Sequence, residues 1–169
     1  MFSSDPNEPT VALAPQRSSR PARTPRFLIA DDSPEDRAIA FFAFTAVEEL
    51  QSAKIDFVED GEELLLYLRG QGKHVGRRKA PLPDFVLLDL NMPKKSGLEA
   101  LAEIRSDAAL RDLSVVVLST SSSPTDKRAI EELDAVDFMT KPEDFETLVE
   151  FFRYLARFFY DESYGVYRV

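Results

Sequence analysis

Apolar residues follow two alternating patterns along this chain. Short, mainly apolar runs bounded by polar residues, Pro or Gly are typical of buried β-strands. They recur at residues 27–30, 55–58, 85–88, 115–118 and 136–140. Between them, apolar residues recur every three or four positions, which predicts helices over residues 33–50, 62–69, 96–107, 124–133 and 145–160. This alternation predicts an α/β domain in which a five-stranded parallel sheet carries helices on both faces.

The first predicted helix has a clear start and one apolar face. Ser33 suits the N-cap, Pro34 suits the first helical position, and acidic residues follow in the first turn. Four apolar residues recur at helical spacing and indicate that the helix runs to about residue 50: Ile39, Phe42, Ala46 and Leu50.

The two ends of the chain differ from the predicted domain. Residues 1–25 contain five prolines among Ser, Thr and Arg without hydrophobic periodicity, which predicts a disordered N-terminal tail. The domain is expected to span residues 26–160, with a C-terminal extension at 161–169. Residues 70–83 are rich in Gly, Pro, Lys and Arg, and we interpret them as a long basic loop. Because no further domain follows in this sequence, we expect output through a partner.

The composition of the chain argues against several classes of function. A net charge of −9 argues against sequence-independent binding to nucleic acid and against binding to anionic membranes. The chain has no Cys, which excludes disulfides and thiolate chemistry. The longest apolar run, residues 64–68, is too short to cross a bilayer, and the N-terminus lacks a signal peptide. We therefore expect a cytoplasmic protein.

Polar groups follow four of the predicted strands. Asp31 and Asp32 follow the first strand, Asp89 the third, Ser119 and Thr120 the fourth, and Lys141 the fifth. Each has an ordinary interpretation as a cap, a turn residue or a surface charge. In a parallel sheet, however, these strand ends meet at one edge, where α/β proteins bind their ligands.

Three carboxylates at one edge need a cation, because two of them about 4 Å apart repel by roughly 4 kcal/mol at an effective dielectric constant near 20. Oxygen ligands without Cys or a nearby His favour Mg²⁺, with Mn²⁺ as the alternative. A metal, an ammonium and a hydroxyl around Asp89 would suit a phosphoryl group that the carboxylate attacks.

These motifs resemble the receiver domain of bacterial two-component response regulators. The matching segments are residues 28–33, residues 89–93 with Gly97, the Ser119-Thr120 pair and Lys141-Pro142. The resemblance covers about residues 26–160 and implies a flavodoxin-like fold of five β/α units. It also implies a phosphoprotein that catalyses its own phosphotransfer and slow autodephosphorylation and is not otherwise an enzyme.

The resemblance implies a role for each acidic residue. Asp89 would be the phosphoacceptor. The carboxylates of Asp32 and Asp89 and the backbone carbonyl of Asn91 would hold Mg²⁺, and Asp31 would reach the ion through water.

It also implies the residues of the conformational switch. Ser119 would bond the phosphoryl group, although Thr120 remains the alternative because the family usually has Thr followed by a small residue. Lys141 would pair with the phosphoryl oxygens, Phe138 falls at the aromatic switch position, and a cis peptide bond would precede Pro142.

The long loop at residues 70–83 and the aromatic C-terminus look most like single-domain regulators that pair with phytochrome-type histidine kinases.

Two other functions compete with that of a phosphorylated receiver domain. A phosphatase of the haloacid dehalogenase type requires a second Asp two residues after its nucleophile, where this chain has Asn91. A receiver-like scaffold that is never phosphorylated would be expected to lose an acidic residue or Lys141, and none is lost.

The last predicted helix carries more aromatic residues than one sheet face can cover. We expect Phe145, Leu148, Phe152, Leu155 and Phe159 to cover the sheet. The remaining aromatic residues predict a homodimer interface on this helix and the tail. Its expected members are Phe151, Tyr154, Phe158, Tyr164 and Tyr167.

Overall fold

One parallel sheet organises the fold and confirms the predicted α/β class. The computed structural model describes residues 24–120, 124–133, 137–142 and 144–160. Within these ranges, all strand pairs are parallel, in the order β2-β1-β3-β4-β5. The strands are β1 (Arg26–Ala30), β2 (Lys54–Val58), β3 (Phe85–Asp89), β4 (Ser114–Ser119) and β5 (Asp137–Thr140).

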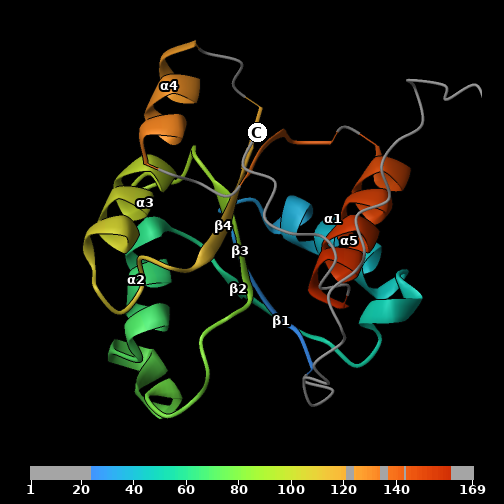
Figure 1. Cartoon of the computed structure of the whole chain (residues 1–169), viewed down its shortest axis with the longest axis horizontal. Helices are drawn as coiled ribbons and strands as arrows, with labels where there is room; N and C mark the ends of the chain where they lie inside the picture. Colours follow the sequence, from blue (N-terminus) through green and yellow to red (C-terminus); the bar gives the residue numbers. More distant parts are fainter. Residues whose placement is uncertain (1–23, 121–123, 134–136, 143, 161–169) are drawn as a thin grey trace, which may run out of the picture.

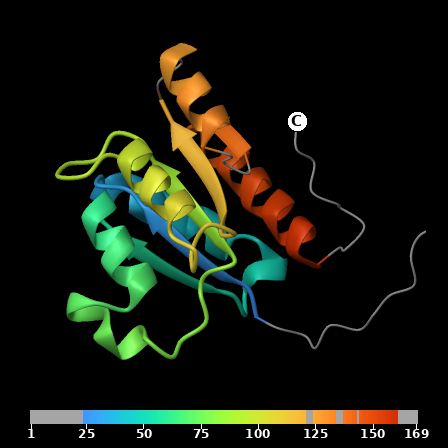
Figure 2. The same cartoon turned by 60° about the vertical axis from the view of Figure 1, so that its left-hand side comes forward.

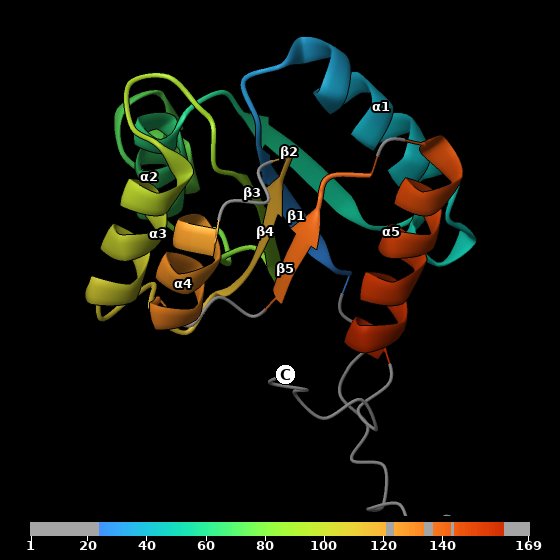
Figure 3. The same ribbon diagram turned by 90° about the horizontal axis from the view of Figure 1, so that it is seen from above.

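Helices cover both faces of this sheet (Figures 1 and 3). On one face lie α2 (Gly61–Arg69), α3 (Gly97–Ser106) and α4 (Pro124–Glu132), and on the other lie α1 (Pro34–Thr45) and α5 (Phe145–Tyr160). Two short 3₁₀ helices, η1 (Glu48–Leu50) and η2 (Gly72–Arg77), lie in the connections. No helix in the described ranges has the length and apolar character that a membrane crossing requires.

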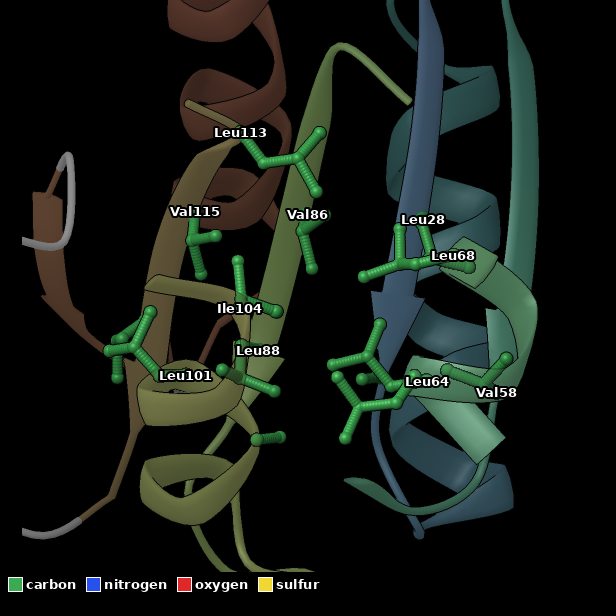
Figure 4. Close-up of a cluster of buried hydrophobic side chains, with 14 of the residues drawn as sticks. Leu28, Val58, Leu64, Leu68, Val86, Leu88, Leu101, Ile104, Leu113 and Val115 are labelled. Carbon is green, nitrogen blue, oxygen red and sulfur yellow. The ribbon is translucent and has the colours of Figure 1, made fainter. Parts of the chain in front are cut away.

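The strands supply alternate residues to two separate cores. In β3, Val86 and Leu88 pack toward α2 and α3, whereas Phe85 and Leu87 pack toward α1 and α5. Figure 4 shows the first core, in which Leu64 and Leu68 of α2 and Leu101 and Ile104 of α3 surround the strand residues. All five residues of β3 are buried, as expected for the central strand of a sheet covered on both faces.

The start of α1 follows the prediction, but its end does not. The Ser33 hydroxyl accepts a hydrogen bond from the Asp36 amide at 3.1 Å, and Pro34 is the first helical residue. The helix ends at Thr45 rather than near residue 50, and η1 follows it.

The apolar residues whose spacing indicated α1 are not all buried: Ile39 is 47% exposed and Phe42 is 62% exposed, whereas Leu50 is buried. The residues that pack on the sheet are Ala40, Ala43 and Phe44. Two alanines let the helix backbone approach the sheet closely, and the Phe44 ring fills the remaining space.

The predicted faces of α5 also need correction. Phe151 is only 6% exposed and packs in the core, so it cannot belong to an exposed stripe. Phe158 is half-buried, with its ring centroid 6.0 Å from that of Phe85. Phe145, which we expected to cover the sheet, is 42% exposed. Because α5 contacts both the sheet and α1, a wider arc of the helix is buried than one sheet face would require.

Several predicted features lie at or beyond the limits of the described residues. Tyr164, Tyr167, and the segments 1–23 and 161–169 lie outside them. Pro25, which we assigned to the tail, is buried, and its carbonyl accepts a hydrogen bond from the Lys54 amide at 2.9 Å. The folded part therefore includes Pro25.

The predicted basic loop contains η2, which lies at the lower end of α2 (Figures 1 and 2). The Arg77 guanidinium lies 3.7 Å from the centroid of the Tyr67 ring, and Tyr67 donates a hydrogen bond to Asp56. His74 lies 3.2 Å from a carboxylate oxygen of Glu63. These contacts hold η2 against α2 and β2.

Candidate phosphoacceptor and metal site

The ends of β1, β3, β4 and β5 bring the predicted polar residues together. Asp31 follows β1, Asp89 ends β3 and Ser119 ends β4. The Lys141 amide donates a hydrogen bond to the Ser119 carbonyl at 3.0 Å, which fixes the residue after β5 beside the end of β4. Parallel pairing therefore places these groups at the carboxyl edge of the sheet, where we predicted them.

Asp31, Asp32 and Asp89 form a possible metal-binding group. One carboxylate oxygen from each residue lies within 4.8 Å of the others. Asp31 and Asp89 are buried, whereas Asp32 is exposed. An all-oxygen donor set with one open side fits a hard divalent cation such as Mg²⁺ or Mn²⁺.

Lys141 lies beside this group and is held by two carboxylates. Its ammonium is 2.7 Å from Oδ2 of Asp31 and also donates a hydrogen bond to Asp36. Oδ2 of Asp89 is farther away, at 3.6 Å. The ammonium thus pairs with Asp31 and Asp36 and lies next to Asp89 without a hydrogen bond to it.

The loop after β3 fixes the Asp89 carboxylate. Oδ1 of Asp89 accepts a hydrogen bond from the Asn91 amide at 3.2 Å, and the Gly97 amide donates to the Leu90 carbonyl at 3.0 Å. A Cβ atom on Gly97 would lie 2.2 Å from the Asp89 carbonyl oxygen, so only glycine allows this approach. The backbone of residues 89–91 therefore turns tightly around the carboxylate.

A further ion pair supports this loop from α2. Lys94 has a φ of 60°, a left-handed conformation that non-glycine residues rarely adopt. Its ammonium lies 2.6 Å from Oδ2 of the buried Asp60, which caps α2. The Gly61 amide donates to the Lys95 carbonyl at 3.1 Å. Sequence reasoning missed this support, because only the fold brings Asp60 next to the loop.

The pKa shifts of Asp89 and Lys141 have different causes. Burial is the main cause that raises the pKa of Asp89, and the nearby charges of Asp31 and Asp32 add to it. The Asn91 amide and Lys141 act in the opposite direction without cancelling the rise. For Lys141, burial alone would lower the pKa, but the hydrogen bonds to Asp31 and Asp36 outweigh it and raise the pKa. A cation bound beside Asp89 would therefore favour its ionised form, and Lys141 stays charged.

The structure describes the side chains of only some of the expected switch residues. Ser119 is buried and Thr120 is exposed. The backbone of Phe138 belongs to β5, but its side chain lies outside the description. The expected cis bond before Pro142 is wrong: the described residues contain no cis peptide bond. A trans bond has the lower energy for X–Pro, and it still lets Lys141 reach Asp31.

Sequence reasoning also missed the contact of Asp36 with Lys141. The sequence indicates that Asp36 is an acidic residue of the first helical turn, and the structure confirms this. From that position its carboxylate also accepts a hydrogen bond from the Lys141 ammonium. A carboxylate one turn after Asp31-Asp32, on the helix that begins beside the strand end, is the signal that could have suggested it.

Comparisons with known proteins identify the family of this chain. A family model described as the response regulator receiver domain matches residues 27–153. The chain is 34% identical over 125 residues to Response regulator Rcp1 of Synechocystis sp., a match that covers 72% of this chain and 79% of that protein.

Two solved structures are similar at the level of the fold and the sequence. The phosphorylated cyanobacterial phytochrome response regulator RcpA gives a TM-score of 0.73 at 32% identity, covering 82% of this chain and 96% of that chain. The Mn²⁺-bound form of response regulator Rcp1 gives a TM-score of 0.70 at 29% identity, with the same coverage. With the family model, the sheet order and the acidic edge all in agreement, the chain belongs to the response regulator receiver family.

Proposed function

We propose that this protein accepts a phosphoryl group on Asp89 in a Mg²⁺-dependent reaction and thereby signals to a partner. The observation that carries this proposal is the position of Asp89. Its buried carboxylate ends the central strand, one of its oxygens lies 3.6 Å from the Lys141 ammonium, and two further carboxylates lie within metal-binding range.

Each residue has a role in that transfer. Asp32, Asp89 and the Asn91 carbonyl would hold the metal, with Asp31 reaching it through water. When bound, Mg²⁺ neutralises charge on the carboxylates and on the phosphoryl oxygens. A carboxylate oxygen of Asp89 attacks phosphorus while the bond to the donor breaks, and the leaving group keeps the electron pair. Lys141 stabilises the charge on the transferred group.

The hydroxyl of Ser119 is our choice for the group that bonds the phosphoryl oxygens afterwards, with Thr120 as the alternative. Phe138 would follow that movement. His74, the only histidine of the chain, pairs with Glu63 beside η2 rather than with Asp89. We therefore expect slow loss of the phosphoryl group rather than rapid turnover of a phosphodonor.

A cytoplasmic sensor histidine kinase is the proposed donor. A phytochrome-type kinase is the finer proposal, because the similar protein RcpA is a phytochrome response regulator. We also propose a homodimer through α5 and the tail. Its interface would include Tyr154, which is 45% exposed, together with Phe158, Tyr164 and Tyr167, but not the buried Phe151.

Intact mass after incubation with acetyl phosphate tests the phosphoacceptor. We expect an increase of one phosphoryl group in the wild type with Mg²⁺, and no increase in Asp89→Asn or after metal chelation. An equal increase in both proteins would refute the assignment of Asp89.

Light scattering at tens of micromolar tests the dimer. We expect twice the chain mass for the full-length wild type and the monomer mass for Tyr154→Glu. A monomeric wild type would rule the dimer out.

A further inference from the structure

Asp36 contacts the Lys141 side chain from helix α1, outside the group of three carboxylates at the edge of the sheet. It lies in the first turn of α1, where its amide is capped by the Ser33 hydroxyl at 3.1 Å. Its carboxylate accepts a hydrogen bond from the Lys141 ammonium, across 105 residues of sequence. Asp36 is not in the group of three carboxylates that could hold a metal. Its contact in the site is therefore with Lys141.

The distances around Lys141 show what this contact does. The ammonium lies 2.7 Å from Asp31 but 3.6 Å from Asp89, beyond hydrogen-bond distance. An ammonium is a compact charge that stays close to the carboxylates that bond it. With Asp31 and Asp36 both as partners, Lys141 is kept toward the α1 side of the site, within ion-pair range of Asp89 but beyond hydrogen-bond distance from it.

This placement affects the two expected ligands of the site in opposite ways. A cation held by Asp32 and Asp89 is repelled less when the ammonium is drawn toward Asp36, because Coulomb repulsion falls with distance. A phosphoryl group on Asp89, by contrast, gains from an ammonium that moves toward it. Lys141 must therefore weaken its contact with Asp36 before it can pair with the phosphoryl oxygens.

We propose that Asp36 is a positioning residue that holds Lys141 beyond hydrogen-bond distance from Asp89, which favours metal binding and slows phosphoryl transfer. The inference rests on the proposed phosphorylation of Asp89 and specifies how its rate is set. It gives Asp36 no ligand role, and its effect passes through the Lys141 side chain.

Two measurements on full-length protein test this role. Calorimetric titration with Mg²⁺, without any phosphodonor, should show about fivefold weaker binding in Asp36→Asn than in the wild type, because the released ammonium approaches the cation. The rate of phosphorylation by acetyl phosphate at saturating Mg²⁺, followed by intact mass, should rise roughly threefold in the same variant.

Two control variants separate positioning from charge and from folding. Glu35→Gln removes the same charge from the neighbouring residue. The Glu35 carboxylate accepts a hydrogen bond from the Ser33 hydroxyl and not from Lys141, so this variant should match the wild type in both measurements. Asp36→Glu restores a carboxylate and should return both values toward the wild type.

A loss of Mg²⁺ affinity together with a gain in phosphorylation rate in Asp36→Asn is the result that distinguishes positioning from a structural role. Parallel losses of metal affinity and rate in Asp36→Asn would reduce Asp36 to a structural residue, and values equal to those of Glu35→Gln would overturn the inference. A wild type that takes up no phosphoryl group would refute the proposed function instead, while the Mg²⁺ titration would still decide whether Asp36 positions Lys141.

Discussion

At the scale of single residues, glycines decide how closely backbone segments approach the phosphoacceptor. A Cβ atom on Gly97 would meet the Asp89 carbonyl at 2.2 Å, and one on Gly61 would meet the Lys95 carbonyl at 2.5 Å. Both obstacles are backbone atoms, which cannot rotate away as the end of a side chain can. The turn that holds Asp89 and Asn91 therefore depends on these two glycines.

We predict that Gly97→Ala lowers the free energy of unfolding by about 2 kcal/mol, because the added methyl group displaces the backbone of Asp89. Mg²⁺ affinity should fall as well, because the same displacement moves the Asn91 carbonyl. Urea denaturation and calorimetric titration measure the two effects. Gly76→Ala is the matched control, since a Cβ there has no neighbour within 4 Å. Equal stabilities of the two variants would contradict the close-packing argument.

Asp60 gives a prediction for pH dependence. Burial alone would raise the pKa of this carboxyl group, but the hydrogen bonds from Lys94 and from the Glu63 amide outweigh it and lower the pKa. A lowered pKa stabilises the fold at pH values above the ordinary carboxyl pKa of about 4, and this contribution is lost as the pH falls through the folded-state value.

Asp60→Asn should therefore cost about 1 kcal/mol of unfolding free energy at pH 7, because the charged hydrogen bond to Lys94 is lost while the cap of α2 is kept. The cost should shrink as the pH falls below about 4. Chemical denaturation of both proteins from pH 7 to pH 3 measures it. A cost independent of pH would show that the Asp60 charge does not matter.

At the scale of elements, hydrophobic patterns predicted which segments form strands and helices better than which helix faces are buried. Each strand run was short and bounded by polar residues, and all five formed. On α1, the apolar periodicity that indicated the helix includes Ile39 and Phe42, but these two residues are exposed and Ala40 and Ala43 are buried instead. Hydrophobicity alone ranks Phe above Ala, whereas close packing of a helix on a sheet rewards small side chains.

The corrected faces of α5 lead to a prediction about neighbouring aromatic residues. Phe152 is fully buried and packs against the rings of Phe27 and Phe44, so Phe152→Ala should lower the unfolding free energy by about 4 kcal/mol. Tyr154→Ala, on the exposed face, should change it by less than about 0.5 kcal/mol when it is measured on the monomer at low protein concentration. Thermal and urea denaturation distinguish the two, and similar losses would show that Tyr154 is also covered.

At the scale of the whole molecule, the site was predictable to the extent that it lies at strand ends. Asp31, Asp89 and Lys141 follow apolar runs, and the parallel sheet alone brings them together. The contacts of Lys141 with Asp36 and of Lys94 with Asp60 could not be predicted in the same way. They depend on where α1 and α2 begin relative to the sheet, which no local pattern specifies.

The central position of β3 has a consequence for how phosphorylation can be observed. This strand is buried along its whole length and paired on both sides, so its amides are expected to exchange with solvent deuterium only when the entire domain unfolds. Exchange at Val86 and Leu87 should therefore follow global stability, with and without a phosphoryl group on Asp89. Local changes in exchange should be confined to the loops around the carboxyl edge, such as residues 90–96. Deuterium uptake of both states measures this, and a local change within β3 would mean that the signal deforms the sheet itself.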